Sequence, residues 1–298
     1  MAMEIGFIPS AKTGAGGVQP ASGDPDRERR ITVAEAAFAD RFDLRAIEID
    51  RWSWPEGLFP EQRAEFELLN QYDLRIACVG LWGAPYLDPD AGERADRELE
   101  RALSFAETVE ADVFVTGTEV PADMDEETAW DEGLAFYGEL TDRITDRGLE
   151  VAYYFGHGEQ PLLDYDMDAL ARFTEAIPNA GLKVDPANLL FAGLDPRVLL
   201  DRFGDRVAHF HIKDALIIED DGERRGIDQP PAGLGDVPWG NVIDLLYLAD
   251  YEGVLSIEPH GDQWGHGAPD DRRRDCIRIA QEHVAQFLRP RHRPAYLQ

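Results

Sequence analysis

The chain has 298 residues, of which 44% are hydrophobic, and this is enough for one large domain or two ordinary ones. Its 59 acidic residues outnumber its 29 basic residues, and the net charge of -30 disfavours binding to nucleic acid through a basic surface. Because so many carboxylates repel one another unless salt screens them, this balance predicts a protein of a high-salt cytoplasm.

Cysteine usage and the apolar runs indicate the same kind of compartment. Cys78 and Cys276 are far apart and form no CxxC pair, so we expect two reduced thiols. No apolar run reaches the roughly 18 residues that a membrane span needs, and the first residues lack the pattern of a signal peptide. We therefore expect a cytoplasmic protein that binds no membrane.

Segments typical of strands and helices alternate eight times along the chain. The strands are expected at 3–8, 44–49, 74–81, 111–117, 149–155, 180–185, 206–213 and 253–258. The helices are expected at 31–40, 61–72, 92–108, 126–147, 166–176, 194–203, 239–250 and 270–288. This alternation predicts an α/β fold, a single (β/α)8 TIM barrel that spans residues 1–298. A mobile loop is expected at 9–30 and a short C-terminal tail at 289–298.

An open, doubly wound sheet has the same alternation and is the competing architecture. It would normally carry a GxGxxG turn after its first strand, and Gly14-Ala-Gly16-Gly17 lacks the third glycine at that spacing. The order of Lys12 and the glycines also differs from that of a P-loop. The barrel is therefore favoured.

The expected strand at 206–213 contains three polar residues at alternate positions. His209, His211 and Lys213 lie two residues apart, which places them on one face, while Phe210 and Ile212 give the other face an apolar character. An isolated HxH pair is more typical of hydrogen-bonded core histidines than of metal ligands. Other strands in this chain alter that balance.

Two further strands end in a carboxylate at an inward position. Asp185 follows one apolar run and Glu258 follows another. Each alone could be a helix cap or a surface carboxylate, but buried carboxylates are costly unless they are paired or bound to a metal. Together with His211 they predict one site for a divalent ion at the carboxyl ends of the strands.

Additional polar residues fall close to these strand ends and are candidates for substrate binding. Glu48 ends the second strand, although a salt bridge to Arg45 or Arg51 is an equal alternative. The substrate-binding candidates are His209, Asn188, His260, His157 and Glu48.

Several linked segments resemble the xylose-isomerase-like TIM barrels, a superfamily of sugar and sugar-phosphate isomerases and epimerases that also includes endonuclease IV. The segments are GLKVDPANL, HFHIKDA and GLGDVPWGNVIDLLYLADYEGVLSIEPH, and the strong match covers about residues 180–261. The resemblance implies that Asp185, His211 and Glu258 bind a divalent ion, which could be Mn, Mg, Co or Zn.

The fifth strand departs from the pattern of that superfamily. Where its members have a metal-binding Glu, this chain offers Tyr154, and Glu150 stands too early in the strand to replace it. His157 or Glu159 could complete the coordination shell. Because the resemblance implies that epimerases use two opposed glutamates as acid and base, this change puts a two-glutamate proton exchange in doubt.

The leading hypothesis is a metal-dependent isomerase or epimerase of a small sugar or sugar derivative that acts through an enediolate. Glu258 is both a ligand and a candidate base, and Lys213 or His209 would stabilise developing negative charge. A related alternative is a sugar or inosose dehydratase in which Tyr154 or His157 is the acid. The predicted partner is a small carbohydrate, and a homo-oligomer is possible.

Two alternatives come from other functional classes. A DNA-repair endonuclease of the AP endonuclease type would need histidines on more strands, and the third and fourth strands have none. A barrel that binds a sugar without chemistry would explain the missing Glu of the fifth strand. Retention of Asp185, His211, Lys213 and Glu258 argues against it, since a site without chemistry has less need of costly buried groups.

Overall fold

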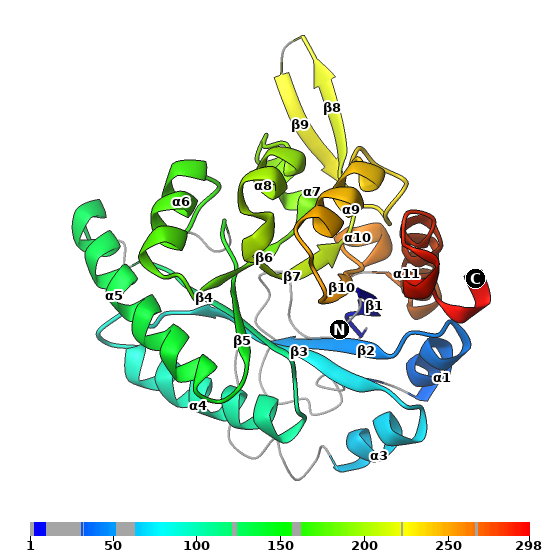
Figure 1. The fold of residues 1–298 in the computed structure, drawn as a ribbon, viewed down its shortest axis with the longest axis horizontal. Helices are drawn as coiled ribbons and strands as arrows, with labels where there is room; N and C mark the ends of the chain where they lie inside the picture. The colour runs from blue at the N-terminus through cyan, green and yellow to red at the C-terminus, as the bar shows by residue number, and fades with distance from the viewer. Residues whose placement is uncertain are drawn as a thin grey trace.

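The computed structural model describes residues 3–9, 31, 33–51, 63–120, 124–156, 162–221, 223–265 and 268–298 (Figure 1). Parallel strands close into a barrel in the order β1-β10-β7-β6-β5-β4-β3-β2. The strands of the barrel are β1 (Glu4–Phe7), β2 (Ala46–Arg51), β3 (Arg75–Ala84), β4 (Val113–Thr118), β5 (Glu150–Tyr153), β6 (Gly181–Val184), β7 (Val207–Ile212) and β10 (Val254–Ile257). The predicted single (β/α)8 barrel is confirmed.

Helices surround this barrel on its outer face (Figure 1). The longer ones lie where the sequence predicts them: α1 (Val33–Arg41), α3 (Arg63–Gln71), α4 (Gly92–Thr108), α5 (Glu126–Thr145), α6 (Met167–Ala176), α8 (Pro196–Phe203), α9 (Trp239–Leu248) and α11 (Asp270–Ala285). Shorter helices are α7 (Pro186–Phe191), α10 (Gly261–Trp264), and the 3-10 turns η2 (Gly204–Arg206), η3 (Pro290–His292) and η4 (Ala295–Leu297).

Helix α4 shows how the sequence produces this outer layer. Its buried residues Leu99, Ala102, Leu103 and Ala106 recur at the spacing of one helical face, and charged residues occupy the other face. Burying an apolar stripe of this kind contributes about 25 cal/mol for each Å² removed from water. The helix is therefore held mainly by packing on the barrel rather than by a side-chain cap, since Ala91 at its N-terminus makes none.

A register shift between β6 and β7 aligns the polar residues of the two strands. Leu182 pairs with Val207, but Lys183 pairs with His209, so Ala208 is an extra residue on β7. The bulge places Lys183 next to His209. Both strands then deliver polar side chains to the same end of the barrel.

The sequence interpretation missed a hairpin that follows β7. Strands β8 (Leu216–Asp220) and β9 (Glu223–Asp228) pair in antiparallel fashion and project from the barrel as the yellow arm in Figure 1. An Asp-Gly pair at 221–222 is a recognised hairpin signal that was available in the sequence. The arm is anchored by the ring of Phe191, which lies over Gly226 where any added Cβ would clash.

The predictions for the N-terminal loop and the C-terminal tail have different outcomes. Residues 10–30 of the predicted mobile loop lie outside the described residues. The expected tail at 289–298 is docked, because the backbone N–H of Ala295 donates to Asp43 at 2.7 Å and Tyr296 donates to Gln281 at 2.9 Å. The extent of the domain over 1–298 stays a prediction.

Candidate metal centre and active site

The three predicted metal ligands meet at one end of the barrel. Asp185 follows β6, His211 lies on β7, and Glu258 follows β10. The Nδ1 atom of His211 is 3.1 Å from Oε2 of Glu258 and 3.8 Å from Oδ2 of Asp185, and one donor atom from each residue lies within 4.8 Å of the other two. Two carboxylates and an imidazole are a donor set that suits a divalent cation.

The two oxygens of Asp185 have separate environments. Oδ1 caps helix α7 by accepting hydrogen bonds from the backbone N–H groups of Ala187 at 3.1 Å and Asn188 at 3.2 Å. Oδ2 is buried and accepts no well-directed hydrogen bond within the described part of the chain. It faces the ammonium groups of Lys213 at 3.0 Å and Lys183 at 3.5 Å. A buried carboxylate oxygen without a directed hydrogen bond can bind a metal ion, for which the two ammonium groups would be competitors.

Lys213 lies between two of the candidate ligands. Its Nζ is 2.7 Å from Oε2 of Glu258 and 3.0 Å from Oδ2 of Asp185. Burial opposes its charge, but Asp185 and Glu258 outweigh that effect and raise the pKa of Lys213. The ammonium therefore neutralises the two carboxylates, and a metal ion that took both oxygens would have to displace it.

Glu48 connects the two histidines of β7 from the opposite side of the barrel. Its Oε2 is 2.8 Å from Nε2 of His209, and Nε2 of His211 lies 3.0 and 3.1 Å from its two oxygens. The alternative salt bridge to Arg45 is wrong, because Arg45 pairs with Asp40 and Asp43. Both oxygens of Glu48 thus lie against imidazole rings, and its predicted contact with a substrate stays a prediction.

The charges of this network are set by burial and by the contacts of each group. Burial lowers the pKa of His209, and Glu48 does not fully offset it. Burial also disfavours charge on His211, but Glu48 and Glu258 outweigh it and raise the pKa of His211 to about 9. Despite burial, the pKa of Glu48 is held well below its ordinary value by His211 and His209. In the absence of metal, His211 is therefore cationic at neutral pH.

Asp50 is a buried carboxyl group that interacts electrostatically with this network and that the sequence interpretation did not assign. It is two positions beyond Glu48 on β2, so strand alternation already indicated the same inward face. Burial, Glu48 and Glu258 raise the pKa of Asp50 to about 7, which lets its carboxyl group hold a proton at neutral pH. Gly80 on β3 leaves room for it, since an added Cβ there would lie 3.0 Å from the Cβ of Asp50.

Comparison with known proteins identifies the family. A profile described as xylose isomerase-like TIM barrel matches residues 13–283. The chain belongs to this family. An inosose dehydratase of Lactiplantibacillus plantarum is 27% identical over 234 residues, which cover 69% of this chain and 75% of that protein.

Solved structures agree in fold with this family assignment. A D-allulose 3-epimerase of Methylomonas sp. has a TM-score of 0.67 and 20% identity, with coverage of 97% of this chain and 100% of the other. A xylose isomerase-like TIM barrel protein of Mycobacterium smegmatis, in complex with magnesium, has a TM-score of 0.64 and 18% identity over 85% of this chain and 89% of the other. The Lactiplantibacillus plantarum relative is an enzyme, in agreement with the prediction for this chain.

Tyr154, which stands where the family resemblance implies a metal-binding Glu, is packed against β3. Its ring stacks on Trp82 with centroids 4.5 Å apart, and its hydroxyl accepts a hydrogen bond from the backbone N–H of Gly83 at 2.8 Å. Gly117 makes space for this ring, because a Cβ at that position would lie 2.7 Å from it. Burial raises the pKa of Tyr154 well above its usual value, which disfavours the phenolate that a metal would need.

The remaining predicted residues are distributed around this centre. Asn188 accepts a hydrogen bond from the side chain of Gln229 at 3.0 Å, and His260 stands at the N-terminus of α10. His157 and Glu159 lie outside the described residues. Lys183, which the sequence interpretation did not assign, lies 5.2 Å from the centroid of the Trp82 ring as well as close to Asp185. Their roles toward a substrate stay predictions.

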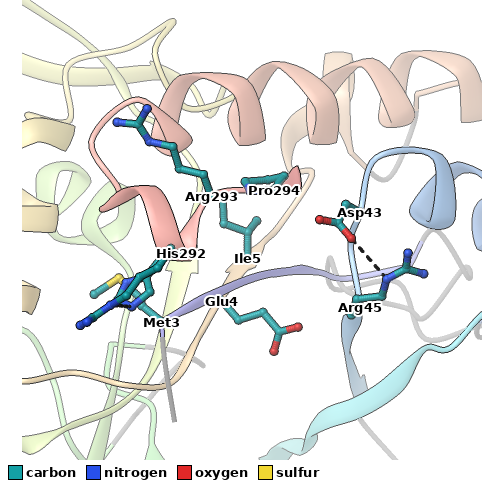
Figure 2. Close-up of a pocket in the computed structure, with 9 residues that line it drawn as sticks. Met3, Glu4, Ile5, Asp43, Arg45, His292, Arg293 and Pro294 are labelled. Carbon is teal, nitrogen blue, oxygen red and sulfur yellow. Dashed lines mark hydrogen bonds and ion pairs between the residues drawn. The ribbon is translucent and has the colours of Figure 1, made fainter. Parts of the chain in front are cut away.

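A pocket at the opposite end of the barrel has a different character. It is lined by Met3, Glu4, Ile5, Asp43, Arg45, Arg291, His292, Arg293 and Pro294 (Figure 2). Its charged groups are used in structural contacts: Arg45 pairs with Asp43 at 3.4 Å, and Arg293 donates to the carbonyl of Leu288 at 2.9 Å. These side chains do not converge on one point in Figure 2.

Within the part of the chain that the structure describes, no helix combines the length and the apolar character of a membrane span.

Proposed function

We propose that this chain is a metal-dependent dehydratase of a polyhydroxylated cyclic ketone of the inosose class. The observation that carries this proposal is the replacement of a carboxylate by Tyr154, which is stacked on Trp82 and hydrogen-bonded to Gly83. An epimerase needs a proton-transfer group on each face of its substrate. Dehydration has no such requirement, and the similarity to inosose dehydratases supports this choice over the isomerase or epimerase first predicted.

The residues at the strand ends fit a divalent ion. Asp185 Oδ2, His211 Nδ1 and Glu258 Oε2 would hold it, and the buried Oδ2 accepts no well-directed hydrogen bond within the described residues. When bound, a divalent ion supplies a Lewis acid that polarises a ketone and a neighbouring hydroxyl group. The magnesium complex of the Mycobacterium smegmatis protein is consistent with this assignment.

The protein groups around this site can handle the charge and the protons of a dehydration. In that reaction a base takes a proton from the carbon beside the ketone, the C–O bond at the next carbon breaks, and the hydroxyl leaves as water after receiving a proton. The ammonium of Lys213, displaced from Glu258 and Asp185 when the ion takes their oxygens, would supply a positive charge that stabilises the developing enolate oxygen.

For proton transfer the site offers the carboxyl groups of Glu258 and Asp50. Lys213 and His211 hold the pKa of Glu258 well below its ordinary value, despite its burial, which favours metal ligation over the role of base. The pKa of Asp50, raised to about 7, suits proton transfer at neutral pH. We therefore give Asp50 the acid-base role that the sequence interpretation gave to Glu258. Its carboxylate would take the proton from the carbon beside the ketone, and the protonated group would then deliver that proton to the hydroxyl that leaves as water.

A substrate panel tests this proposal. Purified protein with added Mn²⁺ would be incubated in deuterated water with inososes, ketoses and aldoses, and products would be followed by mass spectrometry and NMR. We expect a product lighter by one water from an inosose, with no such loss after treatment with chelator. Deuterium exchange into a ketose, accumulation of its epimer and no loss of water would instead assign epimerisation.

A further inference from the structure

We propose that Glu48 is a positioning residue that fixes His211 with Nδ1 presented to the metal. The inference rests on the metal site of the proposed function and deepens it. Glu48 lies on β2, whereas His209 and His211 lie on β7, and these two strands are not neighbours in the barrel. The carboxylate therefore acts as a brace across the interior of the barrel.

The geometry of His211 divides its two ring nitrogens between two environments. Nε2 is 3.0 Å from Oε1 of Glu48, and Nδ1 is 3.1 Å from Oε2 of Glu258. An imidazole can bind a metal through one nitrogen only if any proton is held on the other, and a carboxylate partner commonly fixes that tautomer. Because Glu48 is acceptor-only when ionised, it keeps the proton on Nε2 and leaves the Nδ1 lone pair for the metal.

His209 is the second imidazole that contacts Glu48, but it is not one of the proposed metal ligands. Its Nε2 is 2.8 Å from Glu48, and its ring meets that of His211 edge to face, with centroids 5.3 Å apart and planes at 82°. Both rings and the carboxylate are 1% exposed. Glu48 therefore accepts hydrogen bonds from two imidazole N–H groups at once. This contact gives His209 a structural role on β7 without making it a metal ligand.

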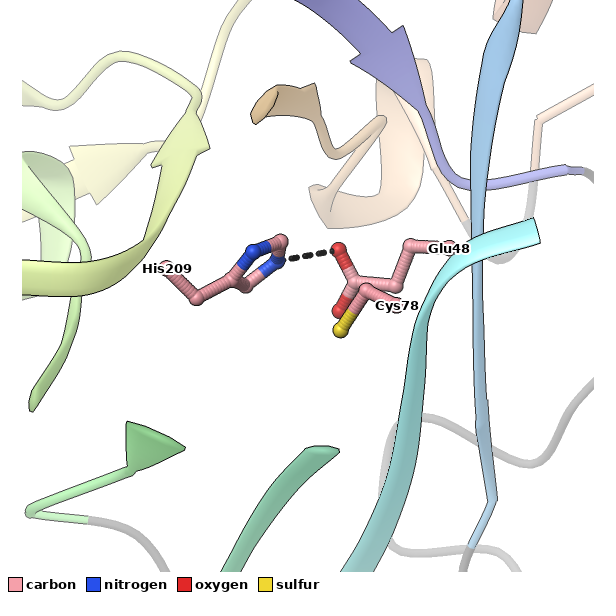
Figure 3. A group of neighbouring side chains, drawn as sticks. All are labelled: Glu48, Cys78 and His209. Atoms are coloured by element: carbon pink, nitrogen blue, oxygen red, sulfur yellow. Dashed lines mark hydrogen bonds and ion pairs between the residues drawn. The ribbon is translucent and has the colours of Figure 1, made fainter. Parts of the chain in front are cut away.

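A second metal ion is a competing explanation for this cluster. Glu48, Cys78 and His209 also lie close enough to share an ion, and Figure 3 shows the sulfur beside the carboxylate. However, Nε2 of His209 and both oxygens of Glu48 are used in short contacts within the network. Burial, Glu48 and Asp50 also raise the pKa of Cys78 well above its usual value, which disfavours the thiolate ligand.

Glu48→Gln is the variant that separates the brace from simple packing. Glutamine keeps the shape of the side chain, but it places an NH₂ donor at one of the two oxygen positions of Glu48, where that donor would face an imidazole N–H. One ring must then change its tautomer or lose a hydrogen bond. Changes of this kind behind a ligand cost about 10- to 100-fold in metal affinity, and we expect that loss for Mn²⁺ by titration calorimetry.

Cys78→Ala is the matched control for this measurement. Cys78 pairs with Glu48 in the register of β2 and β3 and is equally buried, but it supplies no hydrogen bond to His211 among the contacts of the described residues. We expect it to lower stability while leaving the Mn²⁺ affinity close to that of the natural protein. If Glu48→Gln does not fold, Glu48→Asp replaces it and should weaken binding through its shorter reach.

Nitrogen-15 NMR of the imidazoles gives a readout that packing alone would not change. In the zinc-loaded protein we expect the proton of His211 on Nε2, and in Glu48→Gln a shift of tautomer or loss of that protected proton. Unchanged Mn²⁺ affinity in Glu48→Gln, together with complete loss in His211→Ala, would overturn the inference. If His211→Ala keeps its metal, the proposed metal site is wrong. The role of Glu48 has its own test: it would be overturned if the imidazole spectra of the metal-free protein were the same with and without Glu48.

Discussion

The two ends of the barrel both carry networks of opposite charges, but they differ in burial. At the N-terminal end Arg75 pairs with Glu4 and Asp112, and these side chains are 32–41% exposed. At the C-terminal end Lys213 pairs with Asp185 and Glu258, and these side chains are 3–14% exposed. A cation between two carboxylates is therefore partly exposed to solvent at one end and buried at the other.

Exposed and buried ion pairs differ in their contribution to the free energy of unfolding. An exposed pair contributes about 0–1 kcal/mol and is weakened by salt. A buried charge loses several kcal/mol of hydration, which its partners only partly restore. Stability thus explains poorly why Asp185, Lys213 and Glu258 are buried, whereas the proposed metal site would account for it.

Asp185→Asn should give the largest effect and tests whether the buried end is a metal site. Asparagine keeps the cap on helix α7, because its side-chain oxygen can still accept from Ala187 and Asn188. It removes the negative charge that faces the ion, so we expect loss of stoichiometric Mn²⁺ binding in a folded protein. Metal analysis after dialysis measures the bound Mn²⁺, and circular dichroism shows whether the variant is folded.

Arg75→Ala is the matched variant at the other end. It removes the exposed pairs with Glu4 and Asp112, and we expect a decrease in unfolding free energy of about 1 kcal/mol with no change in metal content. The contrast between the two ends would fail if Asp185→Asn kept its metal or if Arg75→Ala lost it.

The pH dependence of metal affinity is the next largest effect. Below the pKa of His211, about 9 in the metal-free protein, binding must release the proton from Nδ1. Metal affinity should therefore rise about tenfold per pH unit from pH 6 to 8, as expected for release of one proton. A flat calorimetric profile over this range would contradict ligation through His211.

The same pKa also predicts how stability depends on pH when metal is absent. The pKa of His211 rises from 6.5 in the unfolded chain to about 9 in the folded one. The folded protein then binds more protons between these values, so its stability falls as pH rises. The contribution of His211 is complete below pH 6.5 and is lost as pH passes 9. Urea unfolding in chelator at several pH values measures this.

The sequence predicts the barrel and the ligand set because both follow from short-range patterns. Strand alternation and the polar residues at strand ends place Asp185, His211 and Glu258 together once a barrel is assumed. The pairing of Glu48 with His209 and His211 joins residues more than 160 positions apart. No local pattern specifies that contact, so its role needed the structure.

Other features were missed for different reasons. Lys183 could have been assigned from alternation with Asp185, but its approach to Trp82 joins β6 to β3, and no local pattern specifies that contact. The hairpin β8–β9 is largely exposed and adds little to the apolar pattern, so the Asp-Gly signal at 221–222 of the sequence was overlooked. The predicted high-salt cytoplasm rests on the net charge and stays a prediction.

Tyr154→Phe should give the smallest effect on the proposed metal site. It tests whether the phenol at the buried end takes part in metal binding or turnover. The variant leaves the backbone N–H of Gly83 without its acceptor, and this should cost about 1–3 kcal/mol of stability. Stacking on Trp82 is kept. Because the phenol is packed against β3 and its pKa lies well above the usual value, we expect metal affinity and turnover close to those of the natural protein.

Tyr153→Phe is the control, since Tyr153 is the preceding residue and its hydroxyl lies 3.0 Å from that of Thr141 on helix α5, outside the barrel interior. Both variants should lose stability, as measured by urea unfolding, and neither should lose metal. Loss of metal in Tyr154→Phe alone would make the phenol a ligand in place of the family's Glu. A fall in turnover in Tyr154→Phe alone, with metal retained, would assign its hydroxyl to proton transfer, because the matched loss of a buried hydroxyl at Tyr153 accounts for any effect of stability.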